Sequence, residues 1–303
     1  MNTNTSGANN VAVGKDSLLA NTTGAGNVGI GSDALEANTT ADNNTAVGRS
    51  SMQANTEGHS NVAVGKSSLD SNTTGDQNTA LGFKTLCANT TASGNIAVGA
   101  FSLQTNTEGF SNVAVGTCQP SGYGAALELN TTGDCNVAVG NGALRSNTTA
   151  DNNTAVGTLA SGCNTTGASN TAVGKQALQA NTTGAENTAV GFCSLATNTT
   201  AARNTAVGCG ALKLTTTGCF NTAVGDATLR DNTTGDNNVA VGCGALANNE
   251  TADSNTAIGF KALVTTTTGC RNTAIGQCAM SQNITGDGLS LIHISEPTRQ
   301  VPI

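Results

Sequence analysis

Cysteine is the most reactive residue type in this 303-residue chain, and all ten cysteines lie from Cys87 onward. Their spacing contains no Cys-x-x-Cys pair of the kind that holds a metal ion. A disulfide needs two Cα atoms about 4.4–6.8 Å apart, and in a chain of stacked repeats this favours Cys193 with Cys209 as an intrachain pair. Three interpretations remain open: small buried residues, intrachain bridges in an oxidising compartment, or links between chains.

A second recurrent chemistry is the Asn-x-Ser/Thr motif, which is the acceptor for N-linked glycans. Two interpretations remain open: a glycan scaffold, in which neighbouring Thr hydroxyls are O-linked alternatives, or a turn motif that carries no sugar. The candidate glycan acceptors, each followed by Thr-Thr, are Asn21, Asn38, Asn72, Asn89, Asn130, Asn147, Asn164, Asn181, Asn198 and Asn232.

The remaining polar residues predict no catalysis, no cofactor and no metal site. Before residue 289 the one histidine is His59, so a histidine-based triad has nothing to draw on. Gly208-Cys209-Gly210 belongs to a repeat and does not open a helix, so it is not a nucleotide-binding loop. The net charge of −7 argues against nucleic acid as a partner, and no apolar run approaches the roughly 20 residues of a membrane helix, so we expect no membrane insertion.

These residues are placed by a 17-residue repeat that occurs sixteen times. If its leading Asn is position 1, the repeat reads N-[TV]-A-V-G-x-x-[AST]-L-x-x-N-T-T-[GA]-x-x. Position 1 is Asn in every copy, from Asn10 to Asn272, and position 4 is always Val, Ile or Leu. One longer step contains a seven-residue insertion at 117–123, whose Pro and Gly predict a surface loop.

The repeat predicts an all-β parallel solenoid with one coil per repeat. Positions 1 to 5 are too short for a helix, and Gly and Asn-Thr-Thr-Gly separate them from the next segment. Asn at positions 1 and 12 suits corners and would stack as amide ladders. For position 3, which is Ala in all but one copy, two arrangements remain open: a tight outer face over a core of Val and Leu, or a face packed against another copy.

The frame also indicates where the repeats begin and end. Ala replaces Gly at position 15 in every third repeat, so a 51-residue unit has been duplicated. Met1 falls on position 9, which leads us to expect an internal residue there and no N-terminal cap. We expect the repeat domain to span 1–288. Residues 289–303 contain LSLIHISEPTR, which looks like a translated sequencing adaptor, and we expect this tail to be non-native and the sequence to come from an environmental assembly.

The strand motif, as in NTAVG at 187–191 and NVAVG at 61–65, resembles the head repeats of trimeric autotransporter adhesins and related phage tail-fibre repeats. The repeat is also similar to those of glycosylated extracellular fibres from environmental microbes. These resemblances imply a left-handed parallel β-roll that is extracellular or on a cell or virion surface, and usually trimeric. The period is longer than the usual coil of these heads, because Asn-Thr-Thr-Gly is added.

Together these features predict a structural subunit of an extracellular fibre or filament that is glycosylated and self-associates as a filament or trimer. The alternative is an adhesin or tail-fibre head that binds a host surface receptor. Ice binding is a third hypothesis, but the Thr residues are adjacent and do not form the regular Thr-x-Thr rows that it requires. An enzyme is not expected.

Overall fold

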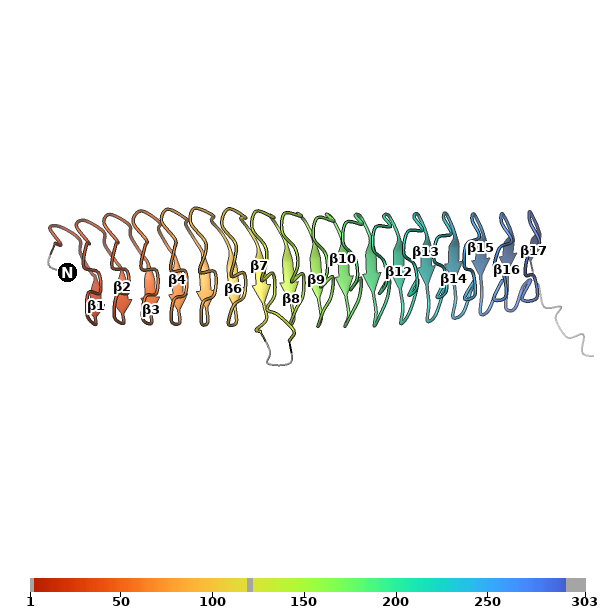
Figure 1. The fold of residues 1–303 in the computed structure, drawn as a ribbon, viewed down its shortest axis with the longest axis horizontal. Helices are drawn as coiled ribbons and strands as arrows, with labels where there is room; N and C mark the ends of the chain where they lie inside the picture. Colours follow the sequence, from red (N-terminus) through yellow and green to blue (C-terminus); the bar gives the residue numbers. More distant parts are fainter. Residues whose placement is uncertain (1–2, 119–121, 293–303) are drawn as a thin grey trace, which may run out of the picture. The chain divides into compact units, whose positions relative to one another are not determined.

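The computed structural model describes residues 3–118 and 122–292. The chain divides into two units, residues 1–186 and 187–303, and both consist of parallel three-residue strands that recur with the repeat (Figure 1). The first unit contains β1 (Val11–Val13), β2 (Val28–Ile30), β3 (Thr45–Val47), β4 (Val62–Val64), β5 (Thr79–Leu81), β6 (Ile96–Val98), β7 (Val113–Val115), β8 (Val137–Val139), β9 (Thr154–Val156) and β10 (Thr171–Val173). The second contains β11 (Thr188–Val190), β12 (Thr205–Val207), β13 (Thr222–Val224), β14 (Val239–Val241), β15 (Thr256–Ile258), β16 (Thr273–Ile275) and β17 (Ser290–Ile292).

Within each unit, each strand pairs in parallel with the equivalent strand of the next repeat. Between β3 and β4, for example, Thr45 pairs with Val62 and Ala46 with Ala63. Identical positions are therefore stacked on one another, which confirms the prediction of a parallel β-solenoid with one coil per repeat. The insertion does not disturb this register, because β7 and β8 still pair Val113 with Val137. Figure 1 shows the chain leaving the stack after β7 and returning before β8.

The alanines of position 3 line the inside of the coil, and both arrangements that placed them outside are wrong. From Ala46 in β3 to Ala274 in β16, every strand alanine is fully buried. The space there is narrow, as Gly29 shows: even a Cβ added to it would lie 2.6 Å from the Ser17 Oγ and 3.4 Å from the Leu18 Cγ. The other copies admit the methyl group of Ala and nothing larger. Because side chains alternate along a strand, positions 2 and 4 must then point outward.

The expected contribution of Leu to the core is confirmed. At position 9, residues such as Leu35, Leu86 and Leu178 are fully buried and face the strand alanines. Their backbone lies in the left-handed region, with φ of 52° at Leu35 and Leu178, which is uncommon for a residue with a branched side chain. The left-handed backbone at this residue reverses the chain direction within the six-residue turn and points the Leu side chain inward. The burial of the apolar side chain offsets the backbone strain.

The corner asparagines form the expected ladders. At position 12, the Asn38 Nδ2 donates to the Oδ1 of Asn21 in the preceding coil (2.8 Å) and to the carbonyl of Ala41 in its own corner (3.1 Å). At position 1, the Asn27 Oδ1 accepts a hydrogen bond from the backbone N–H of Asn44 in the next coil (2.9 Å). Both kinds of Asn are buried, so the amides satisfy polar groups that the narrow coil removes from water.

Near the C-terminus the stack continues past the expected boundary at residue 288. Strand β17 pairs with β16 in the same register, with Thr273 opposite Ser290. Residues 293–303, which contain most of the expected non-native tail, lie outside the described residues, as do residues 1–2 with Met1. No helix in the described part of the chain is long and apolar enough to cross a membrane.

Candidate interaction surface

In each unit, the outward face of the strands has a continuous row of aliphatic side chains. This aliphatic row consists of the position 4 residues, and typical members such as Val64 and Val156 are 40% and 37% exposed. In the first unit the row consists of Val13, Ile30, Val47, Val64, Leu81, Val98, Val115, Val139, Val156 and Val173. Position 2, occupied by Val, Ile or Thr, forms a second and mostly less exposed row on the same face. Together the two rows make the strand face.

The chain turns sharply at the end of each strand, because position 5 is a glycine with a backbone that other residues avoid. Gly48 has a φ of +133°, and a Cβ added to it would lie 2.5 Å from the carbonyl oxygen of Gly65 in the next coil. A side chain at this point would therefore push neighbouring coils apart. The strand face consequently ends at the aliphatic row, without a bulky residue at its border.

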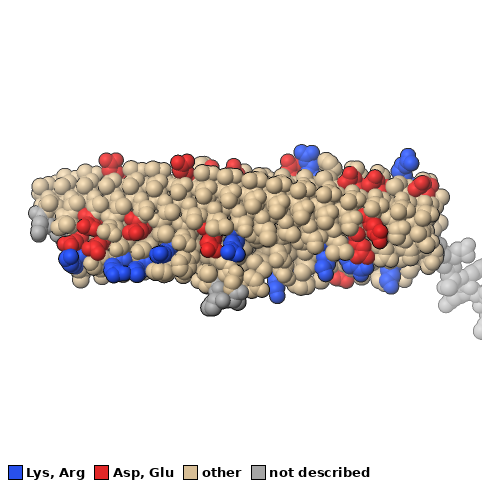
Figure 2. Space-filling view, viewed as in Figure 1, with Lys and Arg blue, Asp and Glu red and all other residues tan. Residues whose placement is uncertain are grey.

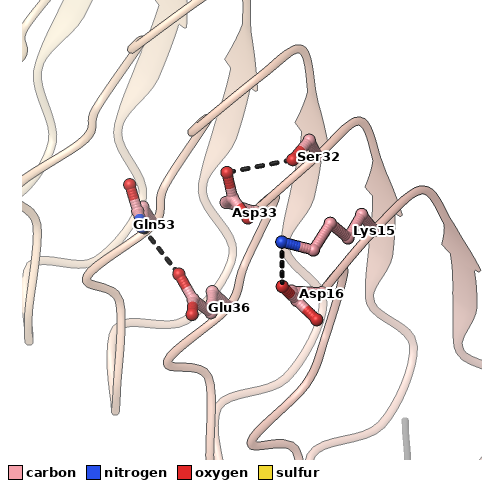
Figure 3. A network of polar contacts seen from close by, with 6 residues as sticks. All are labelled: Lys15, Asp16, Ser32, Asp33, Glu36 and Gln53. Carbon is pink, nitrogen blue, oxygen red and sulfur yellow. Dashed lines mark hydrogen bonds and ion pairs between the residues drawn. The ribbon is translucent and has the colours of Figure 1, made fainter.

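The first unit has positive charge along one border of its strand face. We call positions 6 and 7, which follow the strand, the positive margin, and in this unit they hold five cationic residues and two acidic ones, Asp16 and Asp33. The Asp16 Oδ2 lies 3.4 Å from the Lys15 Nζ, and Asp33 accepts a hydrogen bond from Ser32 (Figure 3). Figure 2 shows several Lys and Arg side chains along the lower side of the N-terminal part. The five cationic residues of the positive margin are Lys15, Arg49, Lys66, Lys84 and Lys175.

The opposite border of the same face is acidic. We call positions 16 and 17, which precede the strand, the negative margin, and in the first unit they hold no Lys or Arg. The Asp42 Oδ1 accepts from the backbone N–H of Ala25, and the Asp76 Oδ1 from that of His59, both at 2.6 Å. These bonds to the preceding coil fix the carboxylates along the border. The aspartates of this margin are Asp42, Asp76, Asp134 and Asp151.

An aromatic cluster lies within the positive margin. Phe83 and Phe101 meet edge to face with their centroids 5.3 Å apart, and the Lys66 and Lys84 ammonium groups lie 5.7 and 5.8 Å from the Phe83 centroid. Sequence analysis missed this cluster. The spacing of Phe83 and Phe101 by 18 residues, one coil plus one position, was the signal that could have revealed it.

A polar row runs along the wall opposite the strands, at position 10. The Gln53 Nε2 donates to the Glu36 Oε2 in the preceding coil (2.6 Å, Figure 3). Burial raises the pKa of Asp70, and the Lys84 ammonium opposes that rise. Burial also raises the pKa of the Cys87 thiol, which disfavours the reactive thiolate.

The ten candidate glycan acceptors all lie inside the coil. Each is fully buried, and their side-chain nitrogens donate within the ladder, as Asn72 does to Asn55 (2.8 Å) and to Gly75 (2.9 Å). A sugar on that nitrogen would have to occupy the core. This burial argues against N-linked glycans at these ten asparagines. The Thr of position 14, two residues further on, is exposed in both units, as at Thr40 and Thr234.

The cysteine pair suggested by the repeat lies in the second unit, just after two consecutive strands. Cys193 follows β11 at position 7 and Cys209 follows β12 at position 6, where it is exposed. Neighbouring corners therefore hold the two residues, and their pairing stays a prediction.

Across residues 3–118 and 122–292 the structure has neither a pocket nor a group of three His, Cys, Asp or Glu side chains placed to hold a metal ion. The strand face is the outward surface that the repeats build most regularly, because position 4 is aliphatic in every repeat. Comparison of the chain with protein-family models gave no match, and comparison with curated proteins gave none either.

Proposed function

We propose that this chain is a structural subunit of an extracellular fibre or filament, which it forms by associating with other copies through the strand face. The observation that carries the proposal is the aliphatic row: an aliphatic residue occupies position 4 in all sixteen repeats, although it contributes nothing to the interior of the coil. Other outward positions, such as 6, 7 and 16, vary among charged, polar and apolar residues. Extended apolar patches of this kind mark interaction sites.

The buried ladders support a mechanical role. Within each unit, consecutive coils bond to one another through backbone and side-chain amides, so a stack of this kind resists bending and local opening. Glycans, in this proposal, are attached to the exposed Thr hydroxyls of position 14, since the asparagine nitrogens are enclosed.

Electron microscopy and sedimentation of the full chain test the proposal. We expect ordered assemblies, and we expect the triple variant Val47→Lys, Val64→Lys, Leu81→Lys to remain dispersed, because three charges would be buried in the contact. The matched control is Thr40→Lys, Thr74→Lys, Thr91→Lys, which places the same charges on exposed position 14 corners. Assembly of the aliphatic-row variant, or a wild type that is monomeric under all conditions, would contradict the proposal. Short stalks on native cells or virions would favour the adhesin alternative.

A further inference from the structure

We propose that the strand face of the first unit packs against that of a second copy that points in the same direction and lies in register. The positive margin of each copy then lies opposite the negative margin of the other. This inference rests on the proposed function, because it specifies the partner and orientation of the association suggested there.

The spacing of the strand face favours a second copy as its partner. The outward side chains of each row are repeated once per coil, at the roughly 4.8 Å spacing of paired strands. A surface can insert side chains between them along a whole unit only if it has the same spacing. A second copy of the chain has the same spacing because it has the same repeat. The side chains of the two sheets can then interdigitate in a contact that excludes water.

The area is sufficient for a stable contact. In the first unit, ten coils present two outward rows, and the aliphatic row is exposed by 36–55% where its members are most accessible. This amounts to an exposed surface on the order of 1,000 Å² per copy, compared with the roughly 800 Å² per partner of a standard interface.

The charges select the direction. Position 3 is the centre of the strand, so positions at equal distances before and after it correspond to each other. Position 2 corresponds to position 4, position 17 to position 6, and position 16 to position 7. Rotating one copy by 180° about the solenoid direction, which keeps the two copies parallel, brings position 4 onto position 2 and the positive margin onto the negative margin. An antiparallel pair instead places acid opposite acid and cation opposite cation, which is unfavourable.

The register follows from which charges share a coil. Asp42 and Arg49 lie on either side of β3, and Asp76 and Lys84 on either side of β5. With no axial shift, Lys84 at position 7 of one copy lies opposite Asp76 at position 16 of the other. Arg49 at position 6 lies opposite Asn43, and its long side chain reaches the adjacent Asp42. A closed two-fold pair has no axial shift, and both ion pairs then form twice.

The direct test is cross-linking with a carbodiimide, which joins amines to carboxylates without a spacer, on a mixture of unlabelled and ¹⁵N-labelled full chain. Mass spectrometry then identifies links that join one labelled and one unlabelled peptide. We expect a Lys84–Asp76 link between copies. A Lys66–Asp42 link in its place would overturn the register. If the protein assembles and no margin-to-margin link forms, the parallel packing is wrong while the fibre proposal survives; a protein that stays monomeric contradicts both.

A charge reversal provides an independent readout. The variant Arg49→Asp, Lys84→Asp changes two exposed side chains and should raise the concentration needed for association on the order of tenfold at low salt, with a smaller effect at high salt. The control Lys213→Asp, Arg230→Asp makes the same change of net charge at exposed position 10 residues of the second unit. If both variants raise the concentration needed for association equally, the charged margins do not pair between copies.

Discussion

The Nδ2 of Asn38 donates a hydrogen bond to the Oδ1 of Asn21, 2.8 Å away and one coil earlier. The Oδ1 of Asn38 in turn accepts from the Nδ2 of Asn55 at 3.1 Å. Each amide is thus both donor and acceptor along the stack, and none of the three is exposed. Because buried amides are stable only when their hydrogen bonds are made, these corners tie the stability of one coil to that of its neighbours.

The first prediction concerns this ladder. Asn38→Leu removes the two hydrogen bonds that the Asn38 Nδ2 donates and the one that its Oδ1 accepts. It leaves Asn21 and Asn55 with unmet hydrogen bonds, so we expect a loss of roughly 2–4 kcal/mol in the free energy of unfolding. Asn38→Thr should be milder, because Thr266 occupies the same position and its Oγ1 donates to the Asn283 carbonyl at 2.9 Å. Urea unfolding followed by circular dichroism measures both. Thr40→Ala, on the exposed side of the corner, is the control; equal losses at Asn38 and Thr40 would contradict the ladder.

The second prediction compares the inside and outside of one strand. Ala63→Leu in β4 forces a larger side chain into a space that admits only a methyl group, and we expect a loss of at least about 3 kcal/mol. Val64→Thr, the next residue, changes an outward side chain and should alter the stability of the separated chain by less than about 0.5 kcal/mol. Thermal unfolding at a concentration below association gives both values. The opposite order would mean that the strand faces are reversed.

The repeat made most of this fold predictable, because sixteen copies of one frame show which positions tolerate change. The regularly spaced Gly and Asn residues predicted the strands, the corners and the parallel stacking, and the structure confirms all three. The sequence did not predict which side chains of the strand face the core and which face solvent. Restriction to Ala at position 3 and to Val, Ile or Leu at position 4 indicates that both are constrained, but sequence alone does not say which is inside. The width of the coil decides it, and that width depends on the left-handed turn at Leu35 and its equivalents.

The interaction surface was harder to predict for the same reason. Because the sequence analysis placed Ala outside, the expected contact face was the wrong one. The charged positions on either side of the strand were therefore not recognised as the borders of an interaction surface. The sequence places Asp42 before and Arg49 after the strand, but only the structure shows that positions 2 and 4 of that strand face outward between them.

The third prediction concerns pH. Burial raises the pKa of Asp70 above its ordinary value of 3.8, so the folded chain holds this proton more tightly than the unfolded chain. The resulting stabilisation is present below the unfolded pKa and is lost as pH rises through the folded pKa. Asp70→Gln removes this dependence, and Gln53 and Gln104 already occupy the same position. We expect the variant to gain stability relative to wild type as pH rises from about 3 to 7. A gain that is the same at every pH would show that the carboxylate is not responsible.

The last prediction concerns sugar attachment. When the full chain is secreted from a host that glycosylates both Asn and Thr, we expect peptide mass spectrometry to find the ten buried asparagines bare, because their nitrogens donate inside the coil. Asn4 has the same Asn-x-Ser/Thr motif, and its side chain is exposed, so it serves as the internal control for an active N-linked pathway. Sugar on Thr of position 14, such as Thr74 or Thr91, would identify the exposed corner as the acceptor. Glycans on Asn72 or Asn89 in folded protein would show that the corner opens before or during modification, and would contradict the closed amide ladder.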